Sequence, residues 1–433
     1  MGREATMEKI VSLCKRRGFV YPGSDIYGGL SGTWDYGPLG VALKNNIKNL
    51  WWRMFVEERD DIYGVDAAIL MHPKVWEASG HVEGFQDPLV ECKKCKRRFR
   101  ADQVESKCPE CGGNFGGVRQ FNMMFKTHIG AAEDESSISY SYLRPETAGG
   151  IFVNFKNVVD SFHPKLPFGI AQIGKAFRNE IAPRDFLFRV REMEQMEIEY
   201  FVRRDEWEEN FEIWRKESLR FLDSLGISRK SVHELEVPDR ERAHYSKRTI
   251  DFEFDFPFGR KELLGLAYRT DFDLSAHAKN SGVDLSILEN EGGARVVPHV
   301  IEPSFGVDRS FLALLVSAYT EDELSGEKRI FLKFNATIAP VKAAVFPLLK
   351  NKPELVAKAR EVYSELKKTV PQIMWDDNGN IGKRYRRQDE IGTPACVTID
   401  FETLENDTVT VRARDTGEQM RVSTSELSNI IAS

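Results

Sequence analysis

The chain has 433 residues, of which 41% are hydrophobic and 30% charged, and it carries a formal net charge of −6. This length predicts two or three domains, and the hydrophobic content suffices for globular cores, which excludes a disordered chain or a fibre. No apolar run is long enough to span a bilayer and the first residues lack the apolar core of a signal peptide, so we expect a cytoplasmic protein without membrane contact.

The first predicted elements are a long helix and a strand. Residues Leu39 to Glu57 carry apolar side chains at the period of a helix, after a start signal at Gly37 and Pro38. The apolar run from Val65 to Met71 predicts an extended strand.

Four cysteines follow as two CxxC pairs, separated by twelve residues: Cys92, Cys95, Cys108 and Cys111. This spacing predicts tetrahedral zinc coordination by thiolates, and disulfides are not expected in a cytoplasmic chain. We interpret the zinc as structural, because four protein ligands leave no open position for catalysis.

The next two predicted strands surround the turn IAPRDFLF and read AQIGKAFRNE and RVREMEQMEIEYFV. Side chains two apart share one face of a strand, so Arg178 and Glu180 project together. The second strand has a polar face with Arg189, Arg191, Met193, Gln195 and Glu197, opposite Val190, Met196, Ile198 and Tyr200. An amphipathic hairpin with ion pairs is the simple alternative, but arginines concentrated beside acids suit bidentate recognition of phosphate or carboxylate.

The middle of the chain predicts an α+β domain. Trp207 to Leu225 is an amphipathic helix, and Thr249 to Asp273 and Val296 to Leu315 are strand-like runs that end in an apolar helix. Strands interrupted by insertions and closed by a helix predict an antiparallel sheet.

A smaller α/β domain with a mixed sheet is predicted beyond Phe334 to Ala339, after the charged linker EDELSGEKR. Its predicted elements are, in chain order, a strand over Ile338 to Leu349, a helix over Pro353 to Val370, a strand over Gln372 to Trp375, a helix over Ile381 to Ile391 and a strand over Ala395 to Phe401. A hairpin around Asn406 and Asp407, and a final helix opened by a capping box from Ser423 to Glu426, complete it.

Two basic clusters, Lys93 to Arg100 and Lys383 to Arg387, qualify as RNA contacts, although such runs are more often solvated faces. The second cluster is the better candidate because Tyr385 can stack on a base where arginines neutralise phosphate.

The strings FRNE and RVRE, with the loop between them, resemble the second signature motif of the class II aminoacyl-tRNA synthetases. Four longer strings resemble the glycyl-tRNA synthetase family within that class: YGGLSGTWDYGPLGVALKNN, LRPETAGGIFVNF, EPSFGVDRS and KRYRRQDEIGTP. Each string is low in degeneracy, and together they cover nearly the whole chain.

The resemblance implies a class II antiparallel sheet flanked by helices in residues 1–335, and an α/β anticodon-binding domain in residues 336–433. It places a zinc-ribbon-like insertion at residues 88–118 and a helical insertion at about 203–248. The early helix and strand match the first signature motif of the class, which implies a homodimer. A helix that buries Trp51 and Trp52 within one monomer is the alternative.

The resemblance also implies a reaction in which ATP and Mg²⁺ activate glycine to glycyl-adenylate, before transfer to the 3′ end of tRNA(Gly). Negative charge builds on the phosphoryl oxygens, so cations aimed there lower the barrier. We expect Arg178 to contact the α-phosphate, Arg309 the triphosphate and adenine face, and Glu180 the adenine amino edge. Motif positions extend the ATP-binding set to Asn179, Phe188, Arg189, Arg191, Met193, Glu262, Leu263, Glu302 and Ser304.

Glycine recognition requires an anionic pocket for the ammonium group, whereas larger amino acids can be excluded by their size without an editing site. The matching positions are Arg100, Glu146, Gln195, Glu197, Glu302 and Ser304. Three acids from distant segments would repel one another unless a cation joins them. The expected tRNA contacts come from the second basic cluster and are Lys383, Arg384, Arg386 and Arg387.

Three positions depart from the family pattern. Met193 stands where a phenylalanine usually stacks on adenine, Gly149 replaces a glutamine, and Arg260-Lys261 replaces a tryptophan-containing pair. Two alternatives stay open: a noncatalytic synthetase-like accessory protein that binds nucleic acid, and a class II synthetase for another amino acid. The joint presence of the arginines and acids argues against the first, and the RPET and EPS strings favour glycine over the second.

Overall fold

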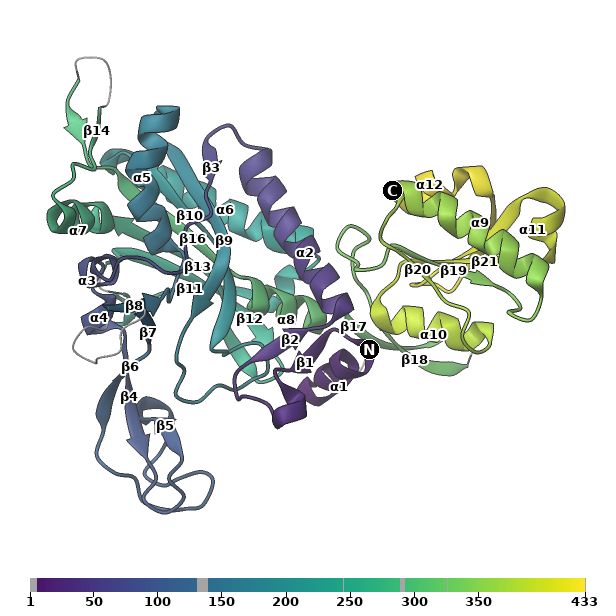
Figure 1. The fold of residues 1–433 in the computed structure, drawn as a ribbon, viewed down its shortest axis with the longest axis horizontal. Coiled ribbons are helices and arrows are strands. Elements are labelled where there is room, and N and C mark those ends of the chain that lie inside the picture. Colours follow the sequence, from purple (N-terminus) through teal and green to yellow (C-terminus); the bar gives the residue numbers. More distant parts are fainter. Residues whose placement is uncertain (1–5, 131–138, 244, 289–292, 325, 433) are drawn as a thin grey trace.

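The computed structural model describes residues 6–130, 139–243, 245–288, 293–324 and 326–432. Figure 1 shows a large N-terminal body, a smaller C-terminal body and a finger that projects from the large one. None of the helices in these ranges is both long and apolar enough to cross a membrane.

A seven-stranded sheet forms the centre of the large body. Its strands, in spatial order, are β11 (Val232–Glu236), β12 (Arg248–Phe256), β13 (Gly259–Thr270), β16 (His299–Gly306), β10 (Glu192–Val202), β9 (Phe168–Phe177) and β3 (Ile62–Gly64). All neighbours are antiparallel except β3 and β9. The predicted antiparallel α+β fold is therefore confirmed.

Helices cover both faces of this sheet (Figure 1). One face packs on α2 (Pro38–Trp52, continued by a π-helical turn Arg53–Glu57), α6 (Trp207–Leu225) and α8 (Val307–Ala318). The other packs on α5 (Ala148–Phe162) and α7 (Phe272–Ser281). Alternation in β10 sends Met196, Ile198 and Tyr200 to the first core, so Glu197 and Glu199 face α5 and α7. Trp51 is fully buried against Phe55 and Phe305 inside the monomer.

The strand predicted from Val65 to Met71 is wrong. The strand in this region is β3, which ends at Gly64, and beyond it Leu70 makes only one isolated bridge, to Leu143. The physical reason is that the Ala67 carbonyl accepts from the Arg144 side chain, at 2.7 Å, instead of from a neighbouring strand.

The segment at about 203–248, expected to be a helical insertion, contains α6 as predicted and also β11, which forms one edge of the large sheet. The projecting finger is a three-stranded sheet of β5 (Arg98–Arg100), β4 (Gln86–Glu91) and β6 (Arg119–Asn122). The remaining elements of the large body are short apart from α1: α1 (Met7–Arg17), β1 (Val20–Pro22), β2 (Trp34–Tyr36), α3 (Lys74–Ala78), α4 (His81–Gly84), β7 (Phe125–Ile129), β8 (Ser139–Leu143), β14 (Ile287–Leu288) and β15 (Arg295–Val296).

The charged stretch predicted as a linker is instead a hairpin of β17 (Tyr319–Leu324) and β18 (Glu327–Leu332). Its charges are used for packing: Arg329 is almost fully buried, donates to Asp322 at 2.7 Å and also reaches Asp389 in the C-terminal body.

The C-terminal body has the predicted mixed sheet, in the order β20 (Ile373–Trp375), β19 (Ala343–Pro347), β21 (Ala395–Ile399), β22 (Thr408–Ala413) and β23 (Gln419–Ser423). The first three strands are parallel and the last two pairings antiparallel. Its core on one face is formed with α9 (Pro353–Thr369) and α12 (Leu427–Ala432), while α10 (Ile381–Ile391) packs on the other.

Two local predictions in this body are wrong. Residues 406 and 407 are not a hairpin turn, because Asp400 caps a short helix, α11 (Phe401–Asn406), that ends there. The hairpin is formed by β22 and β23. The capping box expected from Ser423 to Glu426 does not form: the Ser423 side chain accepts from the Ser425 amide and caps a 3₁₀ turn ahead of α12.

Candidate active site

The arginine-rich loop between β9 and β10 begins earlier than the sequence indicated. β9 ends at Phe177 and β10 begins at Glu192, so Arg178 and Glu180 lie in the loop and not in a strand. The Arg178 amide still donates to the Arg191 carbonyl at 2.9 Å, which holds the two ends of the loop together. Asp185 and Phe186 adopt positive φ angles of 59° and 58° and form its turn.

This loop and the ends of β10, β12, β13 and β16 surround a cavity of about 470 Å³. Most of the residues proposed for ATP and glycine line it: Arg100, Glu146, Arg178, Glu180, Phe188, Arg189, Met193, Gln195, Glu197, Glu262, Leu263, Glu302, Ser304 and Arg309. Two do not. Arg191 donates to the carbonyls of Ser31 and Glu180. The backbone amide of Asn179 donates a hydrogen bond to the Met123 carbonyl.

Several arginines line the cavity, among them Arg100, Arg178 and Arg189. Arg178 uses its Nε to reach the Pro145 carbonyl at 3.1 Å, and its two Nη atoms bond to nothing in the described part of the chain. Arg189 lies 3.5 Å from Glu180, and Arg100 lies 2.6 Å from Asp87. The free guanidinium edge of Arg178 is thus available to an anion.

An aromatic ring and a guanidinium in the cavity lining also stack on each other. Arg309 lies 4.4 Å from the centre of the Phe188 ring and pairs with Glu262 at 3.1 Å. The charge of Arg309 lowers the pKa of Glu262. Met193, at the position where the family has a stacking phenylalanine, is not the residue that faces Arg309. Phe188 supplies a flat surface that the sequence pattern assigned to residue 193.

Buried acids also line the cavity, and Glu197 is the one with the most hydrogen-bond donors. One carboxylate oxygen accepts from the amides of Thr147 and Ala148 at 3.0 Å each, and from the Thr147 hydroxyl. The other accepts from Gln195 and Ser304 at 2.8 Å each. Both oxygens of this buried carboxylate therefore have hydrogen-bond donors.

The other two predicted acids have partners that sequence reasoning missed. Glu146 lies 3.3 Å from His81, and His81, Arg269 and Arg178 lower its pKa to about 2 against the opposite effect of burial. Glu302 accepts from Arg269 at 2.9 Å, but burial still raises its pKa to about 8. The expectation that a cation joins the acids could have led to Arg269, the arginine four residues before Asp273 on the same sheet-to-helix junction.

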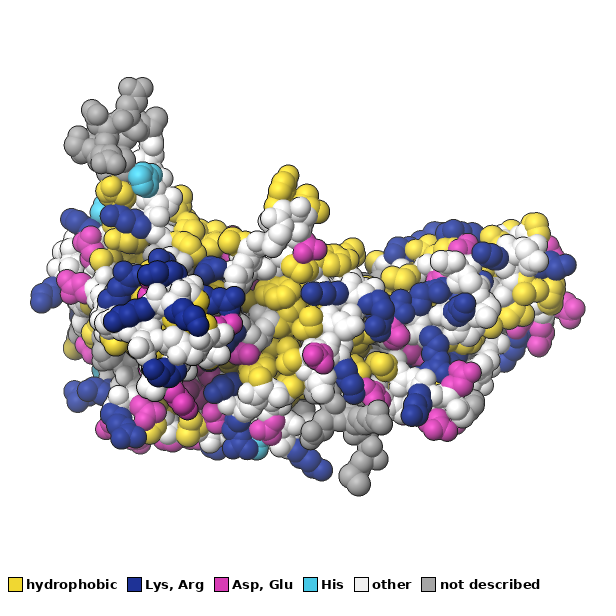
Figure 2. All heavy atoms as spheres, turned by 90° about the horizontal axis from the view of Figure 1, so that it is seen from below, with side chains coloured by type: hydrophobic (Ala, Val, Ile, Leu, Met, Phe, Trp, Pro, Cys, Tyr) yellow, Lys and Arg dark blue, Asp and Glu magenta, His cyan; other side chains and the backbone are white. Residues whose placement is uncertain are grey.

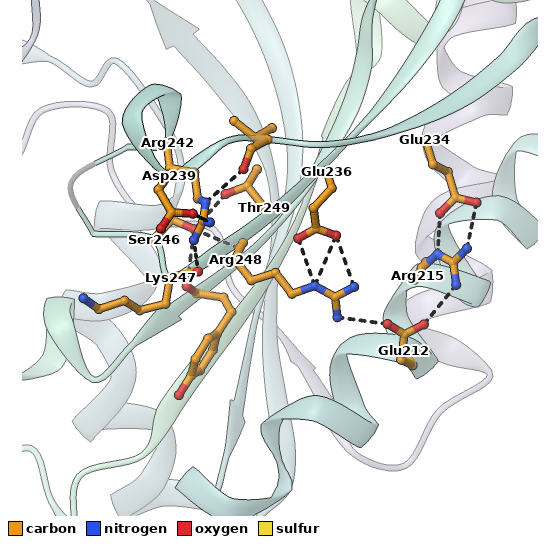
Figure 3. A network of polar contacts seen from close by, with 12 residues as sticks. Glu212, Arg215, Glu234, Glu236, Asp239, Arg242, Ser246, Lys247, Arg248 and Thr249 are labelled. Atoms are coloured by element: carbon orange, nitrogen blue, oxygen red, sulfur yellow. Dashed lines mark hydrogen bonds and ion pairs between the residues drawn. The ribbon is translucent and has the colours of Figure 1, made fainter.

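A segment between Val237 and Thr249 forms another wall. Its Tyr245 lines the cavity, and Arg269 stacks on that ring at 3.7 Å. Figure 3 shows how the segment is anchored: Arg242 donates to the carbonyl of Lys247 and to Asp239, and its Nε reaches the Val237 carbonyl at 3.0 Å. Sequence reasoning also missed this segment, which carries no motif that it recognised.

Beside it, Figure 3 shows a chain of ion pairs that joins α6 to β11 and β12. Arg248 bonds to Glu236 and Glu212, and Arg215 bonds to Glu212 and Glu234. These partly exposed pairs tie the inserted helix to the sheet edge next to the cavity wall.

The four predicted metal ligands converge at the tip of the finger. The Sγ atoms of Cys92, Cys95, Cys108 and Cys111 all lie within 4.8 Å of one another, with two contacts of 3.5 and 3.7 Å. Tetrahedral zinc with Zn–S bonds of about 2.3 Å requires S–S distances of about 3.8 Å, whereas a disulfide needs about 2.05 Å. A side chain at Gly113 would lie 3.0 Å from the Cys92 sulfur, so the position favours glycine. The thiols therefore fit a metal and not a pair of disulfides.

The structure separates the four residues proposed for tRNA. Arg384 is buried and donates to the carbonyls of Pro347, Asp377 and Gly379, so it is not on the surface. Lys383, Arg386 and Arg387 line an open hollow together with Arg17. Tyr385 is partly buried and bonds to Thr398, so it is not a free stacking platform. Only one side of α10 can therefore meet RNA.

Comparison with known proteins gives the same picture for both bodies. Residues 128–319 match the tRNA synthetase class II core domain (G, H, P, S and T), and residues 342–433 match the anticodon binding domain. The chain is 50% identical to the glycine–tRNA ligase of Caldanaerobacter subterraneus subsp. tengcongensis, over 97% of this chain and 96% of that protein. Identity is 50% to the enzyme of Thermobifida fusca and 51% to that of Clostridium acetobutylicum, each over 99% of this chain and 98% of the relative. The chain therefore belongs to the glycine–tRNA ligase family of the class II aminoacyl-tRNA synthetases.

Proposed function

We propose that this protein is a glycine–tRNA ligase. It joins the carboxylate of glycine to the α-phosphate of ATP with release of diphosphate, and then transfers the glycyl group to the 3′ end of tRNA(Gly) with release of AMP. The observation that carries the proposal is that one cavity is lined both by arginines, among them Arg178 with its free Nη atoms, and by the buried acids Glu146, Glu197 and Glu302. Arginines suit the phosphates of ATP, and buried acids suit the ammonium group of glycine.

The arginines act on the phosphates. Arg178, with free Nη atoms, holds the oxygens on which negative charge builds as the glycine carboxylate attacks. Phe188 and Arg309 stack on each other, and the adenine packs against this pair, while Glu180, beside Arg189, accepts from the adenine amino group. Members of this class use ATP with Mg²⁺, and acids near the triphosphate side are suitable ligands.

Glu262 and Asp251 are the side chains that we assign to Mg²⁺. A Cβ built on Gly265 would lie 3.9 Å from a carboxylate oxygen of Asp251 and 4.0 Å from one of Glu262, so the two carboxylates flank one small gap. Burial and the nearby acids Glu262 and Glu253 raise the pKa of Asp251 to about 7, against the opposite effect of Arg309. Oxygen donors of this kind are the ligands that Mg²⁺ prefers when it also binds phosphates.

Glu146, Glu197 and Glu302 receive the ammonium group of glycine. Each is held by a separate partner, so the three do not collapse onto one another. Glycine is selected by size, because every competing amino acid is larger. The wall that carries Tyr245 excludes the larger side chains, so no editing site is needed.

Zinc in the four-cysteine site has a structural role. The site lies at the tip of the finger, and Arg100 at the finger's base lines the cavity. Folding of the finger around the metal therefore positions one wall of the active site.

The tRNA binds along the face that carries the finger, with the anticodon on residues 336–433. The side chains of Lys93, Lys94, Lys96, Arg97 and Arg98 are all exposed, and Figure 2 shows Lys and Arg side chains gathered on the side where the finger projects. Because Arg100 of the same segment reaches the cavity, we assign these cations to the acceptor end of tRNA. Lys383, Arg386 and Arg387 remain candidates on α10, and Arg384 does not.

The protein acts as a homodimer in the cytoplasm. The segment between β1 and β2 exposes Ile26, Tyr27 and Leu30 by 89%, 88% and 60%, and Val41 of α2 is 47% exposed. Figure 2 shows hydrophobic side chains gathered in the middle of the underside. Adjacent apolar groups of this exposure mark a contact surface, and a second copy of the chain is the partner that we assign. Light scattering of the purified protein, with Tyr27→Asp as the comparison, tests this assignment.

Glycine-dependent exchange of radioactive diphosphate into ATP tests the activity. We expect exchange with glycine and none with alanine or serine, the next larger amino acids. Folded protein that supports no exchange with glycine at saturating ATP and Mg²⁺ would overturn the enzymatic proposal and favour a noncatalytic RNA-binding role.

A further inference from the structure

Behind the proposed ammonium pocket lies a further acid, Glu199, which the sequence did not single out. It is fully buried, and neither of its carboxylate oxygens has a hydrogen-bond partner in the described part of the chain. Glu197, two residues earlier on the same face of β10, has donors on both oxygens. The contrast between these neighbours shows that Glu199 is not an ordinary member of the pocket.

Strand pairing places Glu199 beside Glu302. β10 and β16 are antiparallel, with Glu197 opposite Ser304 and Tyr200 opposite Ile301, so Glu199 lies across from Glu302. Directly opposed residues have Cβ atoms about 4.5–5.5 Å apart, and like charges there repel. Two ionised carboxylates at this position would each need a cation.

The guanidinium of Arg269 is the cation beside this pair, and it is divided between Glu302 and another acid. Arg269 gives its Nε and one Nη to Asp273, at 2.8 Å each, and only the other Nη reaches Glu302. Burying an ionised carboxylate that has no donor costs several kcal/mol, so such a group keeps its proton. Burial and the charge of Glu302 raise the pKa of Glu199 far above its ordinary value, which agrees with the geometry.

We propose that Glu199 is a positioning residue of the ammonium pocket, because the opposed pair of Glu199 and Glu302 carries one proton, on one carboxyl or the other, in the empty pocket and releases it to solvent when the ammonium group of glycine binds. The O–H bond of one carboxylic acid breaks, its proton goes to the buffer, and the positive charge of the substrate takes its place. The proposal rests on the assignment of Glu302 to the glycine ammonium.

Other charged and titratable groups also face this pair. Glu197 and Glu146 approach it from the cavity, Arg269 and Asp273 from β13 and α7, and His277 of α7 and Tyr245 lie beside Arg269. His277 has an unpartnered Nε2, and burial lowers its pKa, so it is the group that could imitate a proton-linked effect. A His277→Gln variant is therefore the matched control.

The coupling predicts a specific dependence of glycine binding on pH. If binding releases one proton, the affinity for glycine rises with pH, by at most about tenfold per unit, until the pair is already ionised. The KM for ATP reports on the phosphate and adenine contacts and should not follow this trend. Glu199→Gln preserves the shape of the side chain and removes the acid opposite Glu302, so the variant should release fewer protons than the unchanged enzyme.

Calorimetric titration of the full-length enzyme with glycine, in buffers of different ionisation enthalpy between pH 6 and 8, counts the released protons. We expect about one proton for the unchanged enzyme and for His277→Gln, and clearly less than one for Glu199→Gln. The KM for glycine in diphosphate exchange should fall with pH in the first two proteins and fall less steeply in the third.

The inference is overturned if the unchanged enzyme binds glycine without releasing a proton, or if Glu199→Gln releases as many. The count for the unchanged enzyme decides the matter even if the variant fails to fold. Absence of exchange with glycine at every pH would instead refute the proposed function, so the two failures are distinguishable.

Discussion

The guanidinium of Arg269 divides its hydrogen bonds between Asp273, which receives two at 2.8 Å, and Glu302, which receives one at 2.9 Å. This relationship fixes the orientation of the acid that we assign to the substrate ammonium. It also links the amino-acid pocket to the start of α7 and, through the stacked ring of Tyr245, to the cavity wall.

Replacement of Arg269 by glutamine should damage both stability and glycine binding. Removal of one partner from a buried ion pair leaves uncompensated charges, so we expect the free energy of unfolding to fall by about 3–5 kcal/mol. The KM for glycine should rise more than that for ATP. Chemical denaturation and exchange kinetics measure the two effects. Lys156→Gln breaks an exposed pair with Asp160, also four residues apart in the sequence, and it should cost less than about 0.5 kcal/mol.

Replacement of Arg178 by alanine should remove adenylate formation while the fold survives. Loss of one preorganised donor to a developing negative charge typically costs about 100- to 1000-fold in rate. Diphosphate exchange measures the loss and thermal unfolding monitors the fold. Arg220→Ala, which removes an exposed arginine paired with Glu217 on α6, is the matched control. Activity within threefold of the unchanged enzyme would show that Arg178 does not hold the phosphate.

Replacement of Met193 by phenylalanine should tighten ATP binding. The methionine lines the cavity on the side of Phe188 and packs on a purine without a planar ring. An aromatic contact adds about 1 kcal/mol, so the KM for ATP should fall by about fivefold with no change in the KM for glycine. If Phe188 alone provides the stacking surface, the variant will show the KM of the unchanged enzyme.

Replacement of Arg242 by glutamine should loosen the wall that carries Tyr245. Its guanidinium joins Asp239, Val237 and Lys247, so its loss frees the segment and should lower kcat/KM for glycine by about tenfold, because a misplaced wall weakens substrate positioning. Arg240 in the same segment is 85% exposed, and Arg240→Gln should have no effect. Equal activity of the two variants would contradict a role of the wall.

Protein purified without chelator should contain about one zinc ion per chain by elemental analysis. Cys108→Ser should lose the metal and lower exchange activity, because the finger that carries Arg100 would no longer fold. Cys396→Ser, which changes a buried thiol far from the cluster, should keep the full metal content. A zinc content far below one in the unchanged protein would exclude the four-cysteine site.

Local periodicity was sufficient to predict many elements of this fold. The helices Trp207–Leu225 and Ile381–Ile391 were predicted to the residue, because their apolar faces have a clear helical period and distinct ends. The strand predicted from Val65 to Met71 was wrong because the Ala67 carbonyl bonds to the Arg144 side chain, a partner that no local pattern reveals. The prediction of a linker before the C-terminal body was wrong because Arg329 of this charged stretch is buried and pairs with Asp389 of that body.

The sequence by itself determined the family, the class II architecture, the order of the motifs and the spacing of the four cysteines, since these depend on residue identity along the chain. Tertiary structure alone decided which charges are satisfied. Glu197 and Glu199 are equivalent by alternation, yet donors for Glu197 come from Thr147 and Ser304, far away in the chain, and no donor among the described residues reaches Glu199. Arg384 belongs to a basic cluster by sequence, and only the packing of α10 turns it inward. The charge state of a buried group depends on its neighbours in space, which composition and period do not specify.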